Sequence, residues 1–131
     1  MDDLQNYAKK LNIFNKVKFL GRISNVNEIY MASDYFLLPS LFEGFPVSLV
    51  EAECSGLPCF ISNFVPHDIC IDDLVNVIDL RLSSSEWAEV IYNSCLNNER
   101  NKFDELCYKL FNVRNTVTKM EETYQSLIIK L

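Results

Sequence analysis

The fold is decided by residues 35–61, which read YFLLPSLFEGFPVSLVEAECSGLPCFI. Two short apolar runs, Tyr35 to Leu38 and Pro58 to Ile61, flank a stretch with helical signals, Pro46 to Ser55. Both runs are continuously apolar and do not alternate with polar residues, which is typical of strands that are buried on both faces. A strand, a helix and a second strand in this order predict a βαβ unit and therefore a parallel sheet.

The same alternation of strands and helices extends along the chain on both sides of this unit. We predict further strands at Val17 to Leu20 and Val75 to Leu80, and helices at Asp3 to Leu11 and Asn25 to Ala32. The fold class is therefore α/β, with a Rossmann-like parallel sheet of about four strands and flanking helices.

A helical tail is predicted over about residues 83–131, and all 131 residues are interpreted as one domain. The tail opens with Ser83-Ser84-Ser85-Glu86, the sequence of a capping box. A second helix is predicted over Asn101 to Leu110 and a third from about Asn115 to the end. The last helix carries one apolar stripe, made of Val117, Met120, Tyr124, Leu127 and Leu131.

The composition limits the partners that this chain can have. The net charge is −6 and 49% of the residues are hydrophobic, which is too apolar for a disordered chain. No Lys or Arg lies between Arg22 and Arg81, whereas nine carboxylates do. Nucleic acids and anionic membranes attract clustered cations, so the composition argues against a nucleic-acid partner.

The sequence shows no sign of a membrane span or a signal peptide. No apolar run approaches the ~20 residues that a span needs, and the first residues, Met1-Asp2-Asp3, are acidic where a signal peptide would be basic. We therefore expect a cytoplasmic protein.

The cysteines agree with that location, because their number is odd and no pair has the C-x-x-C spacing. We interpret them as reduced thiols in apolar surroundings. They are Cys54, Cys59, Cys70, Cys95 and Cys107. Because His67 is the only histidine and the thiols are scattered, we expect no metal site and no cofactor.

All seven glycine and proline residues lie between Gly21 and Pro66, and several of them follow predicted strands. In open α/β sheets, ligands bind beyond the carboxyl ends of the strands, so a site is expected in this span. Ordinary turns would explain the same spacing equally well.

The helix that follows Gly44 has an unusual start. Pro46 is a natural first helical residue, because its missing N–H would have no partner there. Phe45 would then be the N-cap, and its side chain carries no acceptor. The backbone N–H groups of Val47 and Ser48 would be open to an anion such as a phosphate, which the helix dipole also favours.

Two carboxylates are predicted near this helix start. Glu51 lies on the polar shoulder of a mostly apolar helix, beside a predicted core face made of Val47, Val50 and Cys54, and Glu43 lies in the preceding loop. Carboxylates accept hydrogen bonds from sugar hydroxyls while backbone N–H groups hold phosphate, so the pair suits a phosphorylated, polyhydroxylated ligand. Glu51 also fits a surface glutamate in an early helix turn, and no role is predicted for Glu53.

Glu43, seven intervening residues and Glu51, followed by Gly56-Leu57-Pro58, resemble the signature of glycosyltransferase family 4. Val17-Lys18-Phe19-Leu20-Gly21 and Ala32-Ser33-Asp34 are similar to further parts of the same family. Its members are retaining, nucleotide-sugar-dependent enzymes with the GT-B fold. The greatest similarity is to members that assemble bacterial exopolysaccharide or capsule.

The resemblance implies that the chain is part of the C-terminal donor-binding domain of a retaining hexosyltransferase. The parent protein would transfer a sugar from a nucleotide diphosphate to a growing polysaccharide or lipid-linked glycan. Glu43 would contact the donor sugar as the catalytic residue, and Glu51 would bind the nucleotide ribose. The implied donor-binding residues are Glu51, Gly44, Phe45, Pro46, Val47, Gly21, Arg22, Ile23 and Ser40. His67 replaces a glycine-rich stretch of the family near the donor pocket.

The resemblance also indicates what this chain lacks. A full-length member has an N-terminal acceptor domain and two more strands, which carry an Arg and a Lys that clamp the diphosphate. Since no cation lies between Arg22 and Arg81, we expect the chain to be inactive alone and to bind the donor weakly. Missing strands would leave exposed edges, which predicts a homodimer or a swapped assembly. The parent protein would be peripheral to the membrane.

Two other interpretations stay open. A noncatalytic small α/β module that binds a nucleotide or a protein partner would explain the short chain. A flavodoxin-like signalling domain fits less well, because the acidic pocket expected after a first strand is absent.

Overall fold

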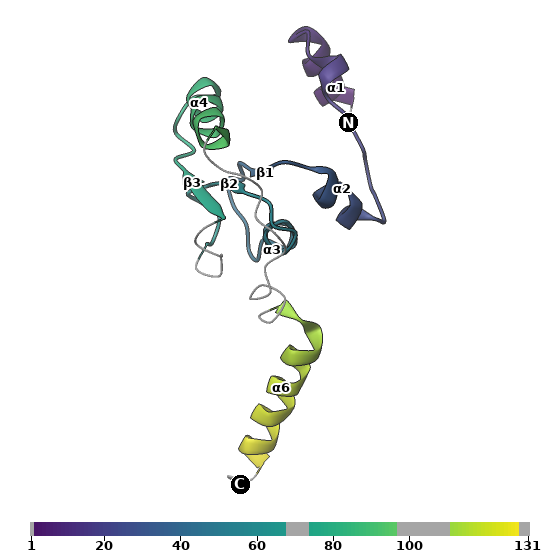
Figure 1. Ribbon diagram of the computed structural model, residues 1–131, viewed down its shortest axis with the longest axis vertical. Helices are drawn as coiled ribbons and strands as arrows, with labels where there is room; N and C mark the ends of the chain where they lie inside the picture. Colours follow the sequence, from purple (N-terminus) through teal and green to yellow (C-terminus); the bar gives the residue numbers. More distant parts are fainter. Residues whose placement is uncertain (1, 68–73, 97–110, 129–131) are drawn as a thin grey trace.

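The computed structural model describes residues 2–67, 74–96 and 111–128 and has a three-stranded parallel sheet at its centre (Figure 1). The strands are β1, Phe36–Leu38, β2, Cys59–Ser62, and β3, Val75–Ile78, in the spatial order β1-β2-β3. In the register of this sheet, Phe60 of β2 lies between Leu37 of β1 and Asn76 of β3. The predicted α/β class and parallel sheet are confirmed.

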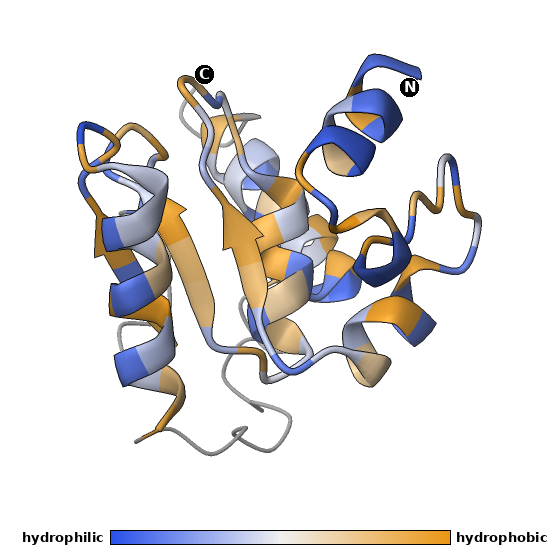
Figure 2. Ribbon diagram, turned by 90° about the horizontal axis from the view of Figure 1, so that it is seen from above, coloured by the Kyte–Doolittle hydropathy of each residue, from blue (hydrophilic) through white to orange (hydrophobic). Residues whose placement is uncertain are grey.

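Helices cover both faces of the sheet, whose strands are mostly hydrophobic (Figure 2). On one face lie α2, Val26–Ala32, and α3, Val47–Cys54. On the other face lies α4, Ser84–Cys95. Helices α2 and α3 were predicted from the sequence to within two residues at each end, and the predicted start of α4 is confirmed.

The α3 face holds the larger part of the core. Leu49 and Ala52 of α3 are fully buried and pack with Tyr30 of α2 and with Cys59 and Ile61 of β2. Alternate residues of β2 point to opposite faces, so Phe60 instead enters the α4 face, where it packs with Ile78 and Trp87.

The buried side of α3 differs from the predicted one. Val47, expected in the core, is 55% exposed, whereas Glu53, for which no role was predicted, is completely buried. The helix is covered by α2 as well as by the sheet, so a wider arc of it is buried than a single apolar stripe indicates.

Helix α4 begins with the predicted capping box. The Ser83 hydroxyl accepts a hydrogen bond from the Glu86 N–H, and the Glu86 carboxylate accepts one from the Ser83 N–H at 2.8 Å. These bonds from the hydroxyl and N–H of Ser83 hold the pKa of Glu86 below its usual value. The two ends of the motif therefore satisfy each other's donors.

The segment before α2 does not form the strand predicted over residues 17–20. These residues follow a 3-10 turn, η1, Phe14–Lys16, without regular structure, and Val17 and Leu20 are exposed. Helix α1, Asp2–Lys10, stands apart from the sheet together with η1 (Figure 1). A strand needs a neighbour for its backbone N–H and C=O groups, and no described strand pairs with this segment. The sheet therefore has three strands instead of about four.

The tail agrees with the prediction where the structure describes it. Helix α6, Val113–Ile128, extends away from the sheet (Figure 1). Its apolar stripe of Val117, Met120, Tyr124 and Leu127 is exposed. Leu131 and the helix predicted over residues 101–110 lie outside the described residues.

One prediction about the cysteines is wrong. Cys54, the last residue of α3, is disulfide-bonded, whereas Cys59 and Cys95 form no disulfide. Spacing along the chain does not reveal which sulfur atoms a fold brings within bonding distance, so the assignment of reduced thiols failed at Cys54. Cys70 and Cys107 lie outside the described residues.

Strand β1 is an open edge of the sheet. Within the described part of the chain no strand pairs with its outer side, and Leu37 at its centre is 51% exposed. A groove of about 400 Å³ beside it is lined mainly by apolar side chains, among them Leu37, Leu82 and Trp87. An unpaired edge and an uncovered apolar groove both favour association with another chain.

Replacing Leu49 by Ala is expected to lower the free energy of unfolding by about 2–5 kcal/mol, because the substitution leaves a cavity where α3 meets the sheet. Leu4→Ala is the matched control, since Leu4 is also helical but 64% exposed, and should change that free energy by less than about 0.5 kcal/mol. Urea denaturation followed by circular dichroism measures both, and equal effects would contradict the described core.

The chain is expected to self-associate at tens of micromolar, with light scattering giving at least twice the mass of 15.2 kDa. Val117→Lys with Tyr124→Lys should shift the mass toward the monomer, because both side chains lie on the apolar stripe of α6.

The control carries the same added charge on the opposite side of α6, as Asn115→Lys with Ser126→Lys, and should keep the mass of the unmodified chain. A monomer before any substitution would refute the expectation.

Candidate functional site

The predicted site lies where β1 ends and α3 begins. The Ser40 hydroxyl, two residues after β1, donates a hydrogen bond of 2.7 Å to Oε1 of Glu43. The Ser40 carbonyl in turn accepts a hydrogen bond from the hydroxyl of Ser62, a completely buried residue at the end of β2. The loop that carries Glu43 is therefore tied to two neighbouring strands.

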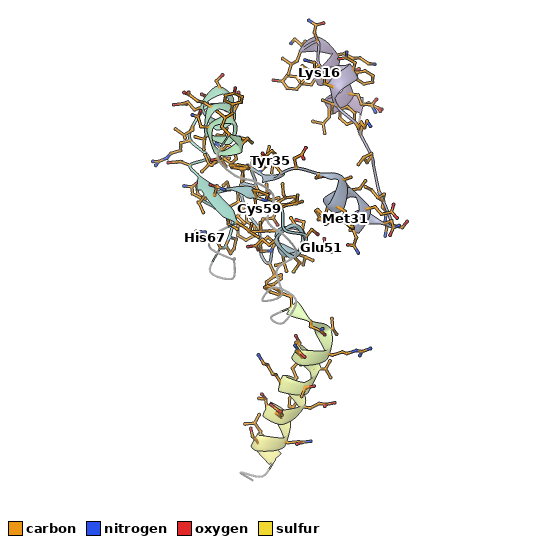
Figure 3. The ribbon with its side chains drawn as sticks, viewed as in Figure 1. Lys16, Met31, Tyr35, Glu51, Cys59 and His67 are labelled. Atoms are coloured by element: carbon orange, nitrogen blue, oxygen red, sulfur yellow. The ribbon has the colours of Figure 1, made fainter. Side chains whose placement is uncertain are left out.

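Glu51 is held separately, by a residue that the sequence did not single out. The Tyr30 hydroxyl, on α2, donates a hydrogen bond of 3.1 Å to Oε2 of Glu51, on α3. Figure 3 shows Glu51 on the side of α3 that faces α2, near the labelled Met31. Each of the two carboxylates thus has a hydroxyl donor of its own, one on α2 and one in the loop after β1.

The helix start itself differs from the prediction by one residue. Pro46 is the N-cap and Val47 is the first helical residue, so the predicted N-cap Phe45 lies one position outside. The Val47 N–H is not open to a ligand, because it donates to the Phe45 carbonyl at 2.9 Å. Among the described residues, the Ser48 N–H has no backbone or side-chain acceptor, so one of the two predicted groups stays available.

The other residues predicted around this start are mostly exposed. Gly44, Phe45 and Val47 are open to solvent and Pro46 is buried. A Cβ atom built on Gly44 would meet nothing within 4 Å, so a ligand can approach the backbone closely there.

The loop predicted to border a base is not joined to this site. Gly21, Arg22 and Ile23 are exposed, and Gly21 has a φ of 65°, a left-handed conformation that favours glycine. Among the described contacts, no hydrogen bond or ion pair connects these three residues with Glu43 or Glu51. They lie on the same irregular segment that replaced the expected strand.

Residues 1–105 match the family model described as glycosyl transferases group 1. The chain belongs to this family. Because the match covers β1, α3 and β2, it includes the whole loop and helix start that carry Glu43 and Glu51. The resemblance seen in the sequence is thus confirmed at the level of the group 1 glycosyltransferases.

Three similar proteins are bacterial glycosyltransferases. The Bacillus subtilis (strain 168) protein EpsF, described as a glycosyltransferase, is 39% identical over 68% of this chain and 23% of its own length. An Escherichia coli galactosyltransferase that acts on GlcNAc-diphosphoundecaprenol is 28% identical over 98% of this chain and 35% of its own. The capsular polysaccharide biosynthesis glycosyltransferase CapH of Staphylococcus aureus is 26% identical over 92% of this chain and 36% of its own length. This group 1 chain therefore spans about a quarter to a third of the length of these relatives.

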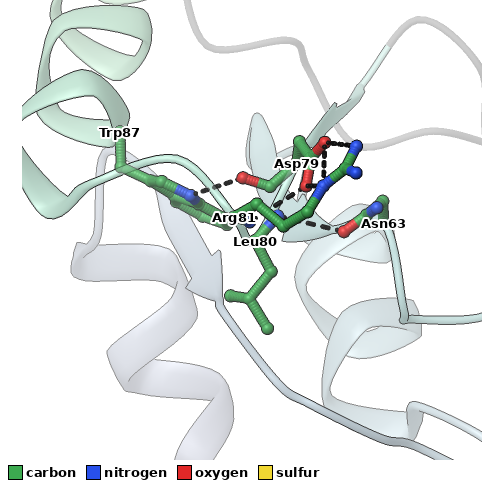
Figure 4. A network of polar contacts seen from close by, with 5 residues as sticks. All are labelled: Asn63, Asp79, Leu80, Arg81 and Trp87. Atoms are coloured by element: carbon green, nitrogen blue, oxygen red, sulfur yellow. Dashed lines mark hydrogen bonds and ion pairs between the residues drawn. The ribbon is translucent and has the colours of Figure 1, made fainter.

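A polar network fixes the carboxyl ends of β2 and β3 in this glycosyltransferase chain (Figure 4). The Asn63 side-chain oxygen accepts from the Leu80 N–H at 3.0 Å, and the Trp87 indole donates to the Asp79 carbonyl at 3.1 Å. The Arg81 guanidinium holds the carboxylate of Asp79, which lowers the pKa of Asp79 to about 2. Arg81 is thus the first cation after Arg22, and it is already paired.

His67 and the acidic residues offer no metal site in the described part of the chain. No three His, Cys, Asp or Glu side chains gather there. The His67 ring nitrogen Nδ1 is 3.0 Å from the Val65 carbonyl, a contact within its own loop.

None of the described helices is long and apolar enough to cross a membrane.

Tyr30 and Ser62 are the two residues that the sequence analysis missed. Tyr30 could not be recognised from the sequence, because an aromatic residue in an amphipathic helix is usually a core residue, and Tyr30 is one as well. Ser62 had a signal that could have been used: it is a hydroxyl at the end of a continuously apolar strand, where a buried polar group needs a partner.

The Tyr30 phenol is expected to lose its proton only at high pH. Burial first, and then the hydrogen bond to Glu51, raise the pKa of Tyr30 to about 12, above the usual 10. The neutral phenol therefore stabilises the folded state fully below pH 10, and this contribution is lost as the pH rises toward 12. The Cζ resonance of ¹³C-labelled tyrosine measures the titration directly.

In Glu51→Gln the pKa of Tyr30 should fall but stay above 10, because burial is the larger cause. A Tyr30 resonance that titrates near 10 in the folded unmodified chain would contradict the described hydrogen bond.

Proposed function

We propose that this chain is the nucleotide-sugar-binding part of a retaining family 4 glycosyltransferase. The full protein would transfer a sugar from a nucleotide diphosphate donor to a growing polysaccharide or lipid-linked glycan. The observation that carries the proposal is the pair of carboxylates, Glu43 and Glu51, each oriented by a hydroxyl beside one exposed helix start. Membership of the group 1 family, in residues 1–105, supports the same assignment.

The residues have separate roles in this proposal. The Glu51 carboxylate accepts hydrogen bonds from the ribose hydroxyls, and the Glu43 carboxylate contacts the donor sugar. The backbone at Gly44 admits the diphosphate and sugar closely, and the Ser48 N–H is placed to donate to a phosphate oxygen at the positive end of α3. Ser40 keeps Glu43 in place through its hydroxyl.

The scarcity of cations near the site limits the chemistry that these 131 residues can perform by themselves. Departure of a nucleoside diphosphate builds negative charge that cations must stabilise, and such electrostatic stabilisation usually contributes more to catalysis than any other effect. No Lys or Arg lies between Arg22 and Arg81, and Arg81 is paired with Asp79. We therefore propose that the chain binds the donor weakly and does not turn it over without cations from elsewhere in the protein.

A cytoplasmic location remains a prediction from the sequence.

Titration of the ¹⁵N-labelled chain with UDP tests the proposal. Amide shifts are expected for residues 40–45, 47 and 48 and for Glu51, with a dissociation constant in the millimolar range, because no cation neutralises the diphosphate. Glu51→Gln should weaken UDP binding about tenfold, the usual cost of losing hydrogen bonds to a charged acceptor. Glu43→Gln should leave UDP binding unchanged and weaken only the additional binding of a UDP-sugar.

Glu122→Gln on α6 is the control, because Glu122 is exposed on a helix that extends away from the sheet, and it should change neither ligand's affinity. Micromolar binding of UDP, or hydrolysis of a UDP-sugar by this chain, would overturn the argument from missing cations. Shifts confined to α4 or α6, or no shifts at all, would instead favour a noncatalytic module.

A further inference from the structure

Tyr30 is placed to act on Glu51 across the interface between α2 and α3. It lies 21 residues before Glu51 in the chain, is only 7% exposed, and donates its hydroxyl hydrogen to Oε2 of that carboxylate at 3.1 Å. The phenol is the only side-chain donor that the described contacts give to Glu51.

The position of the phenol is set by the core. The Tyr30 ring packs edge-on against Phe36 of β1, with 6.1 Å between ring centroids, and belongs to the cluster that contains Leu49 and Ile61. A ring held on several sides cannot turn away without opening the core, so its hydroxyl is a fixed point. Because burial and Glu51 raise the pKa of Tyr30 to about 12, the phenol keeps its hydrogen at neutral pH.

The hydrogen bond restrains a side chain that would otherwise rotate. Glu51 is only half-buried, and a glutamate in such a position has three rotatable bonds whose ordering costs free energy. A carboxylate has about four lone-pair sites, so one bond to Tyr30 leaves acceptor sites for a ligand with two neighbouring hydroxyls. Ordering before binding lowers the cost of binding.

We propose that Tyr30 is a positioning residue that holds the Glu51 carboxylate ready to accept hydrogen bonds from the two ribose hydroxyls of a nucleotide. This proposal rests on the role proposed above for Glu51. The competing explanation is that Tyr30 only fills space in the core and that its hydroxyl is incidental. The two explanations differ in one respect: only a positioning role makes the hydroxyl matter for the ribose in particular.

The test compares UDP with 2′,3′-dideoxy-UDP, which has the same base and diphosphate but lacks both ribose hydroxyls. The ratio of the two dissociation constants, measured by NMR titration of the full chain, reports the ribose contacts alone. A general loss of structure weakens both ligands and leaves the ratio unchanged. We expect a ratio of about ten for the unmodified chain, as for hydrogen bonds to a charged acceptor.

Tyr30→Phe removes the hydroxyl and keeps the ring, and should lower this ratio to about three, since part of the ordering of Glu51 is lost. Glu51→Gln should lower it further, toward one. Tyr35→Phe is the matched control, because Tyr35 is also partly buried but packs against Phe60 on the α4 face. It should keep the ratio of the unmodified chain.

Glu51→Asp is a further test of the carboxylate that leaves Tyr30 in place. The shorter side chain keeps the charge but withdraws the carboxylate from the ribose as well as from the phenol, so the ratio should fall toward one, as in Glu51→Gln. If Tyr30→Phe keeps the full ratio, the positioning role is wrong while the proposed role of Glu51 stands. If the unmodified chain itself binds both nucleotides equally, both proposals are overturned.

Discussion

The burial of α3 against the sheet is the contact on which the rest of the structure depends. Leu49 and Ala52 are fully buried beneath α2 and β2, so the axis and the start of the helix are fixed. Glu51 projects from this fixed helix, and Glu43 lies in the loop that enters it. Two hydroxyls, from Tyr30 and Ser40, then hold these carboxylates. A stable core thus determines where the polar groups of the candidate site lie.

Much of this arrangement could be predicted from the sequence, because it depends on local patterns. Continuous apolar runs identified β1 and β2, and Ser83 with Glu86 identified the start of α4. The run at residues 17–20 has a strand-like composition and yet forms no strand, because pairing requires a neighbour that composition cannot supply. The hydrogen bond from Tyr30 to Glu51 joins residues far apart in the chain and was not foreseen for the same reason.

The site that results has negative charge and no cation of its own among the described contacts. Two carboxylates, their hydroxyl donors and the Ser48 N–H lie around the first turns of α3, whereas the first cation after this start, Arg81, is held by Asp79. Such a set of groups recognises hydroxyls well and stabilises a departing diphosphate poorly. The chain matches glycosyl transferases group 1 and spans about a quarter to a third of the length of these relatives, and we propose that it holds one end of a donor.

We propose that a nucleotide lies with its ribose against Glu51 near the start of α3. Intermolecular nuclear Overhauser effects between UDP and the chain test it most directly, because they report which protons lie close together. We predict contacts from the ribose H2′ and H3′ protons to the Glu51 side chain. Contacts from these protons to α4 or α6, with none to Glu51, would contradict the claim.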